Sequence, residues 1–201
     1  MLYITKDGHV DAGTKIKLKI ISNIENGKMG KVNGIVVHQT GGPTAESAFA
    51  SYREPKANGA HFLIDVNGQI YQTASLYRIT NHVGKLQSRC LNTKKCAPAE
   101  LKSLHAMGWQ PTAMSRREHK KEWPDRYPTN IDSIGIEIVG HYRTVAGQAE
   151  KVYDPVNDAQ NSSLKWLVHE LADTLSVSMQ EVFRHPQVGR KTETEASTAK
   201  W

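Results

Sequence analysis

VFRHPQVGRKTETEA, residues 182–196, is the stretch around which the rest of the chain can be interpreted. It places His185 directly after a short apolar run and follows it with Lys191 and two carboxylates, Glu193 and Glu195. Histidine and carboxylate side chains ligate metal ions, and a lysine can stabilise a developing negative charge. The stretch therefore predicts part of a metal site, which a second histidine from elsewhere must complete.

The candidate for that histidine lies in GIVVHQTGG, residues 34–42. Its first five residues form a short continuous apolar run, the pattern of a strand covered on both faces. His38 ends this run, as His185 follows the other, and α/β sheets commonly present ligands from strand ends. Taken singly, either histidine is more simply an ordinary hydrogen-bonded side chain. Taken together, they predict a zinc site assembled from two distant loops.

The composition bounds the class of protein. With 201 residues, 38% of them hydrophobic and 23% charged, the chain resembles an ordinary soluble globular domain. No apolar run approaches a membrane span, and the N-terminus lacks the pattern of a signal peptide. The net charge of +6 favours polyanions such as nucleic acid, anionic lipid or the carboxylate-rich bacterial wall. No nucleic-acid module accompanies it, so we expect no nucleic-acid partner and no membrane insertion.

Hydrophobic patterns predict the secondary structure. Strands are expected over Lys15–Ile24, Gly34–His38 and Ser133–Gly140, and Asn67-Gly68 predicts a hairpin over about Ala60–Thr73. Helices are expected after Thr44 as N-cap, within residues 100–109, and over residues 162–177 with Ser162 or Ser163 as N-cap. This order predicts an α/β fold in which helices flank a central mixed sheet.

One domain accounts for the whole chain, residues 1–201. Its core is expected over about residues 32–201, preceded by a strand extension at 1–31. Prolines and charged residues predict an irregular surface insertion at about 88–130. The insertion contains Cys90 and Cys96, whose spacing fits neither a zinc knuckle nor a redox pair. A disulfide fits an oxidising compartment, and two free thiols fit a reducing one.

Glu137 stands in the middle of the apolar run SIGIEIVG, residues 133–140. Burying an isolated carboxylate is strongly unfavourable. Glu137 must therefore lie on a solvated edge, pair with a cation, or face a polar cleft. Its neighbours on both faces are apolar or glycine, which favours a central strand.

Five blocks of the sequence, in order, resemble the zinc-dependent type-2 N-acetylmuramoyl-L-alanine amidases and the related peptidoglycan recognition proteins. They are VNGIVVHQTGG, AHFLIDVNGQIYQ, NHVG, SIGIEIVG and RHPQVGRKTETEA. The resemblance covers about residues 32–201 and is interrupted by the insertion. It implies a central mixed sheet flanked by helices, with a zinc groove on one side. It also implies hydrolysis of the amide between N-acetylmuramic acid and the L-alanine of the stem peptide.

The resemblance also assigns the metal ligands. His38 and His185 match two zinc ligands of the family. The third ligand is a cysteine or an aspartate in the family, whereas this chain offers Glu193 or Glu195. Glu193 has the lysine-x-ligand spacing, and Glu195 has the histidine-to-carboxylate spacing of members that use aspartate. Glu195 is the preferred ligand and Glu193 the alternative.

Further roles follow from the same resemblance. Glu137 matches the catalytic glutamate, and Lys191 matches the lysine near the scissile carbonyl. Some relatives have a tyrosine where this chain has Ala60, which leaves Glu137 as the only evident base. His82, in NHVG, matches a histidine that lines the groove; its other role would be to hold the loop by hydrogen bonds. Zinc would activate water and Glu137 would transfer its proton.

The predicted function is that of a zinc amidase that degrades peptidoglycan, either as an antibacterial effector or as a lysis enzyme. We expect the protein to be secreted or delivered to the bacterial periplasm or wall without a classical signal peptide. Its expected partners are peptidoglycan, a secretion machinery and an immunity protein. A non-catalytic peptidoglycan-binding module is the alternative, because glutamate replaces the usual third ligand. A zinc hydrolase acting on another amide is a third possibility.

Overall fold

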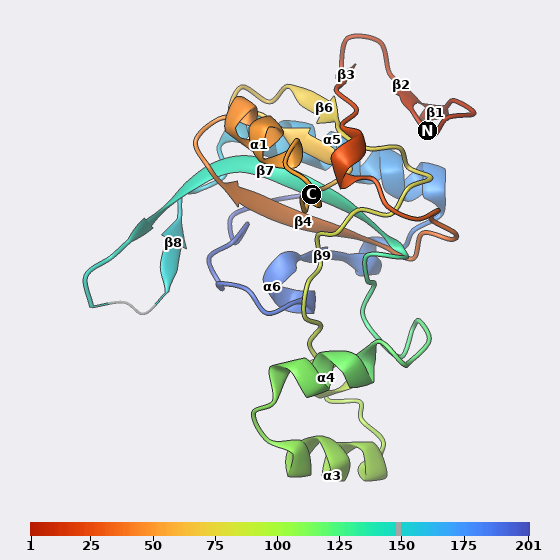
Figure 1. Cartoon of the computed structure of the whole chain (residues 1–201), viewed down its shortest axis with the longest axis vertical. Coiled ribbons are helices and arrows are strands. Elements are labelled where there is room, and N and C mark those ends of the chain that lie inside the picture. The colour runs from red at the N-terminus through yellow and green to blue at the C-terminus, as the bar shows by residue number, and fades with distance from the viewer. Residues whose placement is uncertain (148–149) are drawn as a thin grey trace.

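A computed structural model describes residues 1–147 and 150–201 (Figure 1). In this part of the chain the centre is a seven-stranded mixed sheet. In spatial order its strands are β3 (Ile16–Leu18), β6 (Ile70–Gln72), β5 (Phe62–Ile64), β7 (Ser133–Thr144), β4 (Gly34–Gly41) and β9 (Val182–Arg184), with β8 (Lys151–Tyr153) paired to β7. The β5–β6 and β7–β8 pairs are antiparallel, and the remaining pairs of this sheet are parallel.

Helices and a small second sheet complete the fold. The helices are α1 (Ala45–Tyr52), α2 (Arg89–Asn92), α3 (Pro98–Met107), α4 (Pro111–Glu118), α5 (Asp158–Leu175) and α6 (His185–Val188), with 3-10 turns η1 (Ser22–Ile24) and η2 (Met179–Glu181). Strands β1 (Tyr3–Ile4) and β2 (Val10–Asp11) pair antiparallel near the N-terminus. Among the described residues, no helix combines the length and the apolarity that a membrane span requires.

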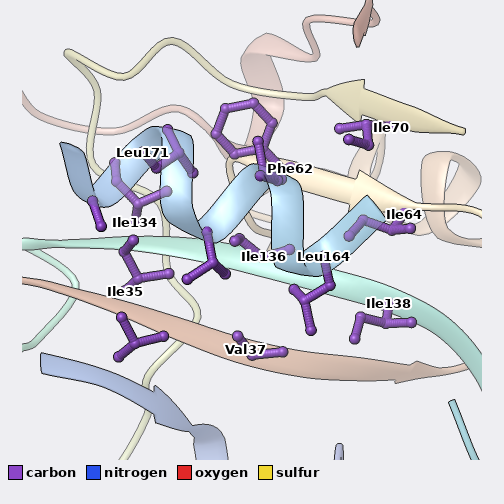
Figure 2. Packing of buried hydrophobic residues seen from close by; sticks show 14 of the residues in the cluster. Ile35, Val37, Phe62, Ile64, Ile70, Ile134, Ile136, Ile138, Leu164 and Leu171 are labelled. Atoms are coloured by element: carbon purple, nitrogen blue, oxygen red, sulfur yellow. The ribbon is translucent and has the colours of Figure 1, made fainter. Parts of the chain in front are cut away.

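Helix α5 covers one face of the sheet (Figure 2). Side chains alternate along a strand, so every second residue of β7 points to this face. Ile134, Ile136 and Ile138 are fully buried there against Leu164 and Leu171 of α5. This large cluster is the main hydrophobic core. The predicted central mixed sheet flanked by helices is confirmed.

The opposite face is only partly apolar. Helix α1 packs on it through Phe49 and Tyr52, which join a cluster with Leu63 and Val139. Figure 1 shows α1 and α5 on opposite sides of the sheet. Further along, a smaller cluster includes Val36 of β4. Polar side chains occupy the space between these two clusters, and this gap holds the candidate site.

The hairpin β5–β6 forms as predicted. Asp65 and Gln69 close the turn with a hydrogen bond from the Asp65 amide to the Gln69 carbonyl, 2.9 Å long. Gly68 takes a positive φ of 83° in that turn, a conformation that glycine adopts without a steric penalty. The strand predicted at Lys15–Ile24, in contrast, is too long.

The strand ends at Leu18, the amides of Lys19 and Ile21 still donate to the Gln72 and Thr73 carbonyls, and the turn η1 then takes the chain out of the sheet. Ile16 belongs to the α5-side core, whereas Ile21 and Ile24 pack beside α1. The start predicted for α5 is also wrong. The helix begins at Asp158 with Asn157 as N-cap, and neither Ser162 nor Ser163 caps it. Asn157 and Gln160 form a reciprocal capping box, which stabilises this earlier start.

The insertion at 88–130 is more regular than expected: the helix expected within residues 100–109 is present as α3, and α2 and α4 also lie within the insertion. Pro98 and Pro111 stand in the first turns of α3 and α4, where a missing amide hydrogen costs nothing. The two prolines therefore begin helices and do not interrupt them. A disulfide joins Cys90 and Cys96 at the base of this segment.

Candidate metal centre and active site

Pairing of β4 with β7 brings the first two site residues together. The strands are parallel, and His38 lies opposite Glu137 in register. Directly opposed residues of neighbouring strands point to the same face, so both side chains leave the sheet on the face away from α5. His38 is only 2% exposed.

The C-terminal segment adds a histidine and a carboxylate. His185 begins α6 directly after β9, which pairs with β4 on the side away from β7. The His38 Nδ1 and His185 Nδ1 atoms are 2.8 Å apart. Glu195 Oε1 lies 3.0 Å from His185 Nδ1 and 3.6 Å from His38 Nδ1. Three buried donor atoms from segments 147 residues apart in sequence therefore converge at one point.

Hydrogen bonds at the Nε2 atoms of the two rings determine which ring nitrogen carries the hydrogen. His185 Nε2 lies 2.8 Å from the Val83 carbonyl oxygen, which can only accept, so Nε2 carries the hydrogen. His38 Nε2 lies 3.0 Å from Nδ1 of His82. His82 Nε2 in turn contacts the Ser133 hydroxyl at 3.2 Å, and that hydroxyl donates to the Thr129 carbonyl.

With one hydrogen on each ring, this series of hydrogen bonds, which ends at the Thr129 carbonyl, allows one arrangement of the hydrogens. His82 Nε2 donates to Ser133, and His82 Nδ1 accepts from His38 Nε2. With one hydrogen on each ring, the Nδ1 atoms of His38 and His185 would both turn lone pairs toward the Glu195 carboxylate. Three electron-rich atoms this close repel one another unless a cation lies among them.

The donor set fits zinc. Two imidazole nitrogens and a carboxylate oxygen are common zinc ligands, and bonds of about 2.0–2.1 Å in a tetrahedral site separate ligand atoms by about 3.3 Å. The observed separations of 2.8, 3.0 and 3.6 Å bracket that value. Burial and the neighbouring His185 lower the pKa of His38 to about 4, so this ring is neutral near pH 7 and free to ligate. The outward bonds are those that orient metal-ligating histidines.

A pocket of about 420 Å³ opens over these three residues. Glu137 and Lys191 line it together with the three donor residues. Burial and the negative charge of Glu195 raise the pKa of Glu137 to about 8, and Lys191 opposes this shift. The Oε2 atom of Glu137 is buried without a hydrogen-bond partner among the described residues. A carboxyl group held in this way can accept and return a proton near neutral pH.

The structure separates the two candidate carboxylates and places His82. Glu195 is 3% exposed and lies with the two histidines, whereas Glu193 is exposed and does not line the pocket. His82 lines the pocket and also bonds His38, so both roles considered for it occur together. Ala60 lies directly before His61 and is fully buried.

Three further pocket residues could not be identified from sequence. Tyr153 comes from β8, and its backbone amide donates to the Thr194 hydroxyl, next to Glu195. Asn130 accepts hydrogen bonds from the amides of His82 and Val83 through one oxygen. Neither Tyr153 nor Asn130 stands in a sequence pattern that predicts these contacts.

Gln39 is the third such residue. Its side chain donates to the Asp154 carbonyl at 2.8 Å and accepts from the Ala196 amide at 3.1 Å. It thereby ties β4 to the segment that carries Glu195. Gln39 directly follows His38, just past the end of the apolar run, but that position gives no sign of these two contacts.

Comparisons with known proteins agree with this architecture. A family model described as N-acetylmuramoyl-L-alanine amidase matches residues 28–196. No curated protein matches the sequence significantly. Among solved structures, AMPDH3 from Pseudomonas aeruginosa is similar with a TM-score of 0.55 and 19% identity, covering 85% of this chain and 57% of that chain.

Two other solved structures give similar values. PlyL has a TM-score of 0.53 and 15% identity, covering 88% of this chain and 84% of that chain. The amidase AmiD from E. coli has a TM-score of 0.52 and 18% identity, covering 80% of this chain and 50% of that chain. At these identities the similarity shows a shared fold. Since the family model spans well over half of the sequence, the chain belongs to the N-acetylmuramoyl-L-alanine amidase family and is an enzyme of that class.

Proposed function

We propose that this amidase is zinc-dependent and hydrolyses the bond between N-acetylmuramic acid and the L-alanine of the peptidoglycan stem peptide. The observation that carries the proposal is the convergence of His38, His185 and Glu195 in one pocket beside the Glu137 carboxyl group. The similar structure of AmiD holds anhydro-N-acetylmuramic acid-L-Ala-D-gamma-Glu-L-Lys, a substrate of that enzyme. A substrate of this class suits the pocket described here.

His38, His185 and Glu195 would hold the zinc ion, and Glu193 would take no part. A zinc ion with three protein ligands supplies an open coordination position and makes bound water more acidic, with a pKa of about 7. Glutamate can replace aspartate or cysteine here because Glu195 Oε1 reaches both rings. The outward bonds to Val83 and His82 orient the two rings, so that both Nδ1 atoms would be available to the ion.

Glu137 acts as the general base and then as the general acid. Its carboxylate takes a proton from the attacking water and delivers it to the amide nitrogen of the departing L-alanine. Burial keeps the carboxyl group able to carry that proton between the two steps. Its unpartnered Oε2 atom leaves an acceptor available for the exchange.

Lys191 stabilises the negative charge that develops on the carbonyl oxygen. It lines the pocket on the same segment as Glu195, and its side chain is exposed to the pocket mouth. A fixed positive charge at this position lowers the energy of the tetrahedral intermediate. It also favours entry of carboxylate-bearing stem peptides.

Mass spectrometry of digested sacculi tests the bond assignment. We expect free stem peptides beginning with L-alanine and intact glycan strands, activity that a chelator removes, and recovery with zinc but not magnesium. Binding to walls without peptide release would instead identify a binding module. Cleavage of small acyl-peptides without any action on walls would identify a hydrolase of another amide.

We also propose that the enzyme works outside the reducing cytoplasm, as an antibacterial effector or a lysis enzyme. The Cys90–Cys96 disulfide supports this, because such bonds persist in oxidising compartments. Expression with an added export signal should lyse bacteria, whereas cytoplasmic expression should not. Equal toxicity from both compartments would contradict the proposal. An effector would further require a secretion machinery and an immunity protein, which co-purification from producing cells tests.

A further inference from the structure

The positive charge of the chain is concentrated in one segment. Residues 88–130, here called the insertion, contain nine basic and four acidic side chains, a net charge of +5. The whole chain has a net charge of +6, so the remaining residues together carry +1. The sheet and its covering helices are therefore almost neutral overall, and the insertion is strongly basic.

Ion pairs inside the insertion use two of its four acidic side chains, the part-buried Glu100 and the buried Glu118. Glu100 of α3 bonds Arg117 and Lys121, and Glu118 of α4 bonds Lys121 at 2.6 Å. These contacts hold α3 against α4. Hydrogen bonds from Arg117 lower the pKa of Glu100 to about 2, followed in importance by those from Lys121, so Glu100 stays ionised.

Two more cations of the insertion are used at its base. Arg89 bonds Glu181 of η2, and Arg126 bonds Asp132 at 3.0 Å. These pairs join the insertion to the sheet and are largely buried. They fix the position of the insertion and are not free to bind a partner.

The cations that remain are exposed. They lie on the disulfide loop, on α3, on α4 and in the turn after α4, and are Lys94, Lys95, Lys102, Arg116 and Lys120. Only two exposed carboxylates of the insertion, Glu122 and Asp125, counter them. Figure 1 shows that α3 and α4 project away from the sheet. The exposed charge thus stands out from the body of the molecule, where a large partner can reach it.

The insertion is continuous with the pocket at two points. Trp109, in the α3–α4 loop, is 79% exposed, and the Arg190 guanidinium lies 4.1 Å from its ring centroid. The next residue, Lys191, lines the pocket, as does Asn130 at the end of the insertion. A polymer chain whose cleaved unit occupies the pocket can therefore extend along the insertion.

We propose that the insertion is a second binding surface for peptidoglycan, on which exposed cations bind carboxylates of stem peptides next to the one being cut. This inference rests on the proposed function and deepens it. Peptidoglycan repeats its stem carboxylates along the strand, and many weak contacts to a repeating polymer add up to strong retention. Long, flexible lysine side chains can reach carboxylates that are spaced apart and solvated, whereas a single shaped pocket binds only one of them.

A matched pair of variants tests the surface. The first changes Lys94, Lys95, Lys102, Arg116 and Lys120 to glutamine. The control makes the same number of changes at exposed lysines outside the insertion, namely Lys6, Lys17, Lys28, Lys165 and Lys200. We expect the first variant to bind purified sacculi at least about tenfold more weakly at low salt, and the control to stay within about twofold of the unaltered protein.

Activity on a small substrate separates this proposal from the proposed function. Both variants should hydrolyse a soluble N-acetylmuramoyl-tripeptide at the unaltered rate, because that substrate fits the pocket alone. If no protein cleaves it while the first variant still loses sacculus binding, the proposed function fails and the surface stands. If all cleave it and the two variants bind sacculi equally, the surface proposal is overturned.

Two further arms identify the bound group. Sacculi stripped of phosphate-containing polymers should still distinguish the variants, and sacculi with amidated stem carboxylates should not. Loss of the difference only after phosphate removal would assign the surface to a phosphate polymer and overturn the proposal. Thermal unfolding checks that both variants fold, and Lys94→Gln with Lys95→Gln alone should give an intermediate loss of binding.

Discussion

The two faces of the central sheet are built from alternate residues of the same strands, yet they differ in chemistry. Toward α5, strand β7 presents Ile134 and Ile136 to a continuous apolar core. Toward the pocket, it presents Ser133, Gly135 and Glu137. One face supplies hydrophobic stabilisation, and the other holds a buried carboxyl group, whose removal from water lowers the stability of the fold.

Neighbouring residues of β7 therefore serve different purposes, one facing the core that stabilises the fold and the next facing the candidate active site. Neighbouring positions differ by about one strand rise, yet they lie in environments with opposite demands. Substitutions on the core face should lower stability and leave the chemistry intact. Those on the pocket face should do the reverse.

The largest expected effect comes from Glu137→Gln on the pocket face. Loss of the general base should lower the rate of stem-peptide release by about 10²–10⁴-fold, while zinc content stays unchanged. The control is Glu193→Gln, since Glu193 is exposed and lies outside the pocket. Full activity in Glu137→Gln would remove it as the base, and zinc loss in Glu193→Gln would exchange the roles of the two C-terminal carboxylates.

On the core face, Ile136→Ala should destabilise the fold. Ile136 is fully buried against α5, and removing such a side chain typically costs about 2–5 kcal/mol of unfolding free energy. Urea unfolding of the zinc-loaded protein measures the loss. Ile131→Ala is the matched control, because Ile131 is 57% exposed and should change stability by less than about 0.5 kcal/mol. A loss of turnover in folded Ile136→Ala would break the separation between the faces.

His82→Ala tests how the pocket face would hold the proposed zinc ion. His82 accepts from His38 Nε2, and loss of such an orienting bond typically weakens metal binding by about 10–100-fold. Competition with a zinc-binding dye measures the affinity without reference to turnover. His169→Ala, on the exposed side of α5, should leave the affinity unchanged. An unaltered affinity in His82→Ala would mean that the ring only lines the groove.

The last expected effect is a pH dependence of stability in the metal-free protein. Burial raises the folded-state pKa of Glu137 from 4.5 to about 8, so between these values the folded protein holds a proton that the unfolded chain has released. Stability should therefore fall as pH rises through that window. Glu137→Gln should flatten the fall in thermal midpoints between pH 5 and 9, measured with chelator present. An identical slope in both proteins would show that Glu137 titrates normally.

Sequence reasoning found the site residues whose surroundings are apolar. His38, His185 and Glu137 each stand out because a charged or titratable side chain interrupts or ends a hydrophobic run. The same patterns predicted the central sheet and the α5 stripe. Where the signal was spacing alone, as for Glu193 and Glu195, the choice depended on the path of the backbone.

The rest required three dimensions. Asn130 acts through two backbone amides on another loop, and Tyr153 enters the pocket from a short outer strand. Neither contact leaves a periodic trace in the sequence. Of the helices in the insertion, the one expected within residues 100–109 is present as α3, whereas α2 and α4 were missed. Pro111 suggests a loop, although proline is favoured at the first turn of a helix.

Asn130 also limits how freely the insertion can be removed or moved to another protein of this fold. Its amide oxygen anchors the backbone at His82 and Val83, and the Val83 carbonyl in turn orients His185. The end of the insertion at Asn130 is thus connected through Val83 to His185, a proposed metal ligand, whereas α3 and α4 have no such connection among the described residues. A homologue without the insertion must satisfy the amides of His82 and Val83 with another acceptor. A chimaera that receives the insertion must also receive Asn130.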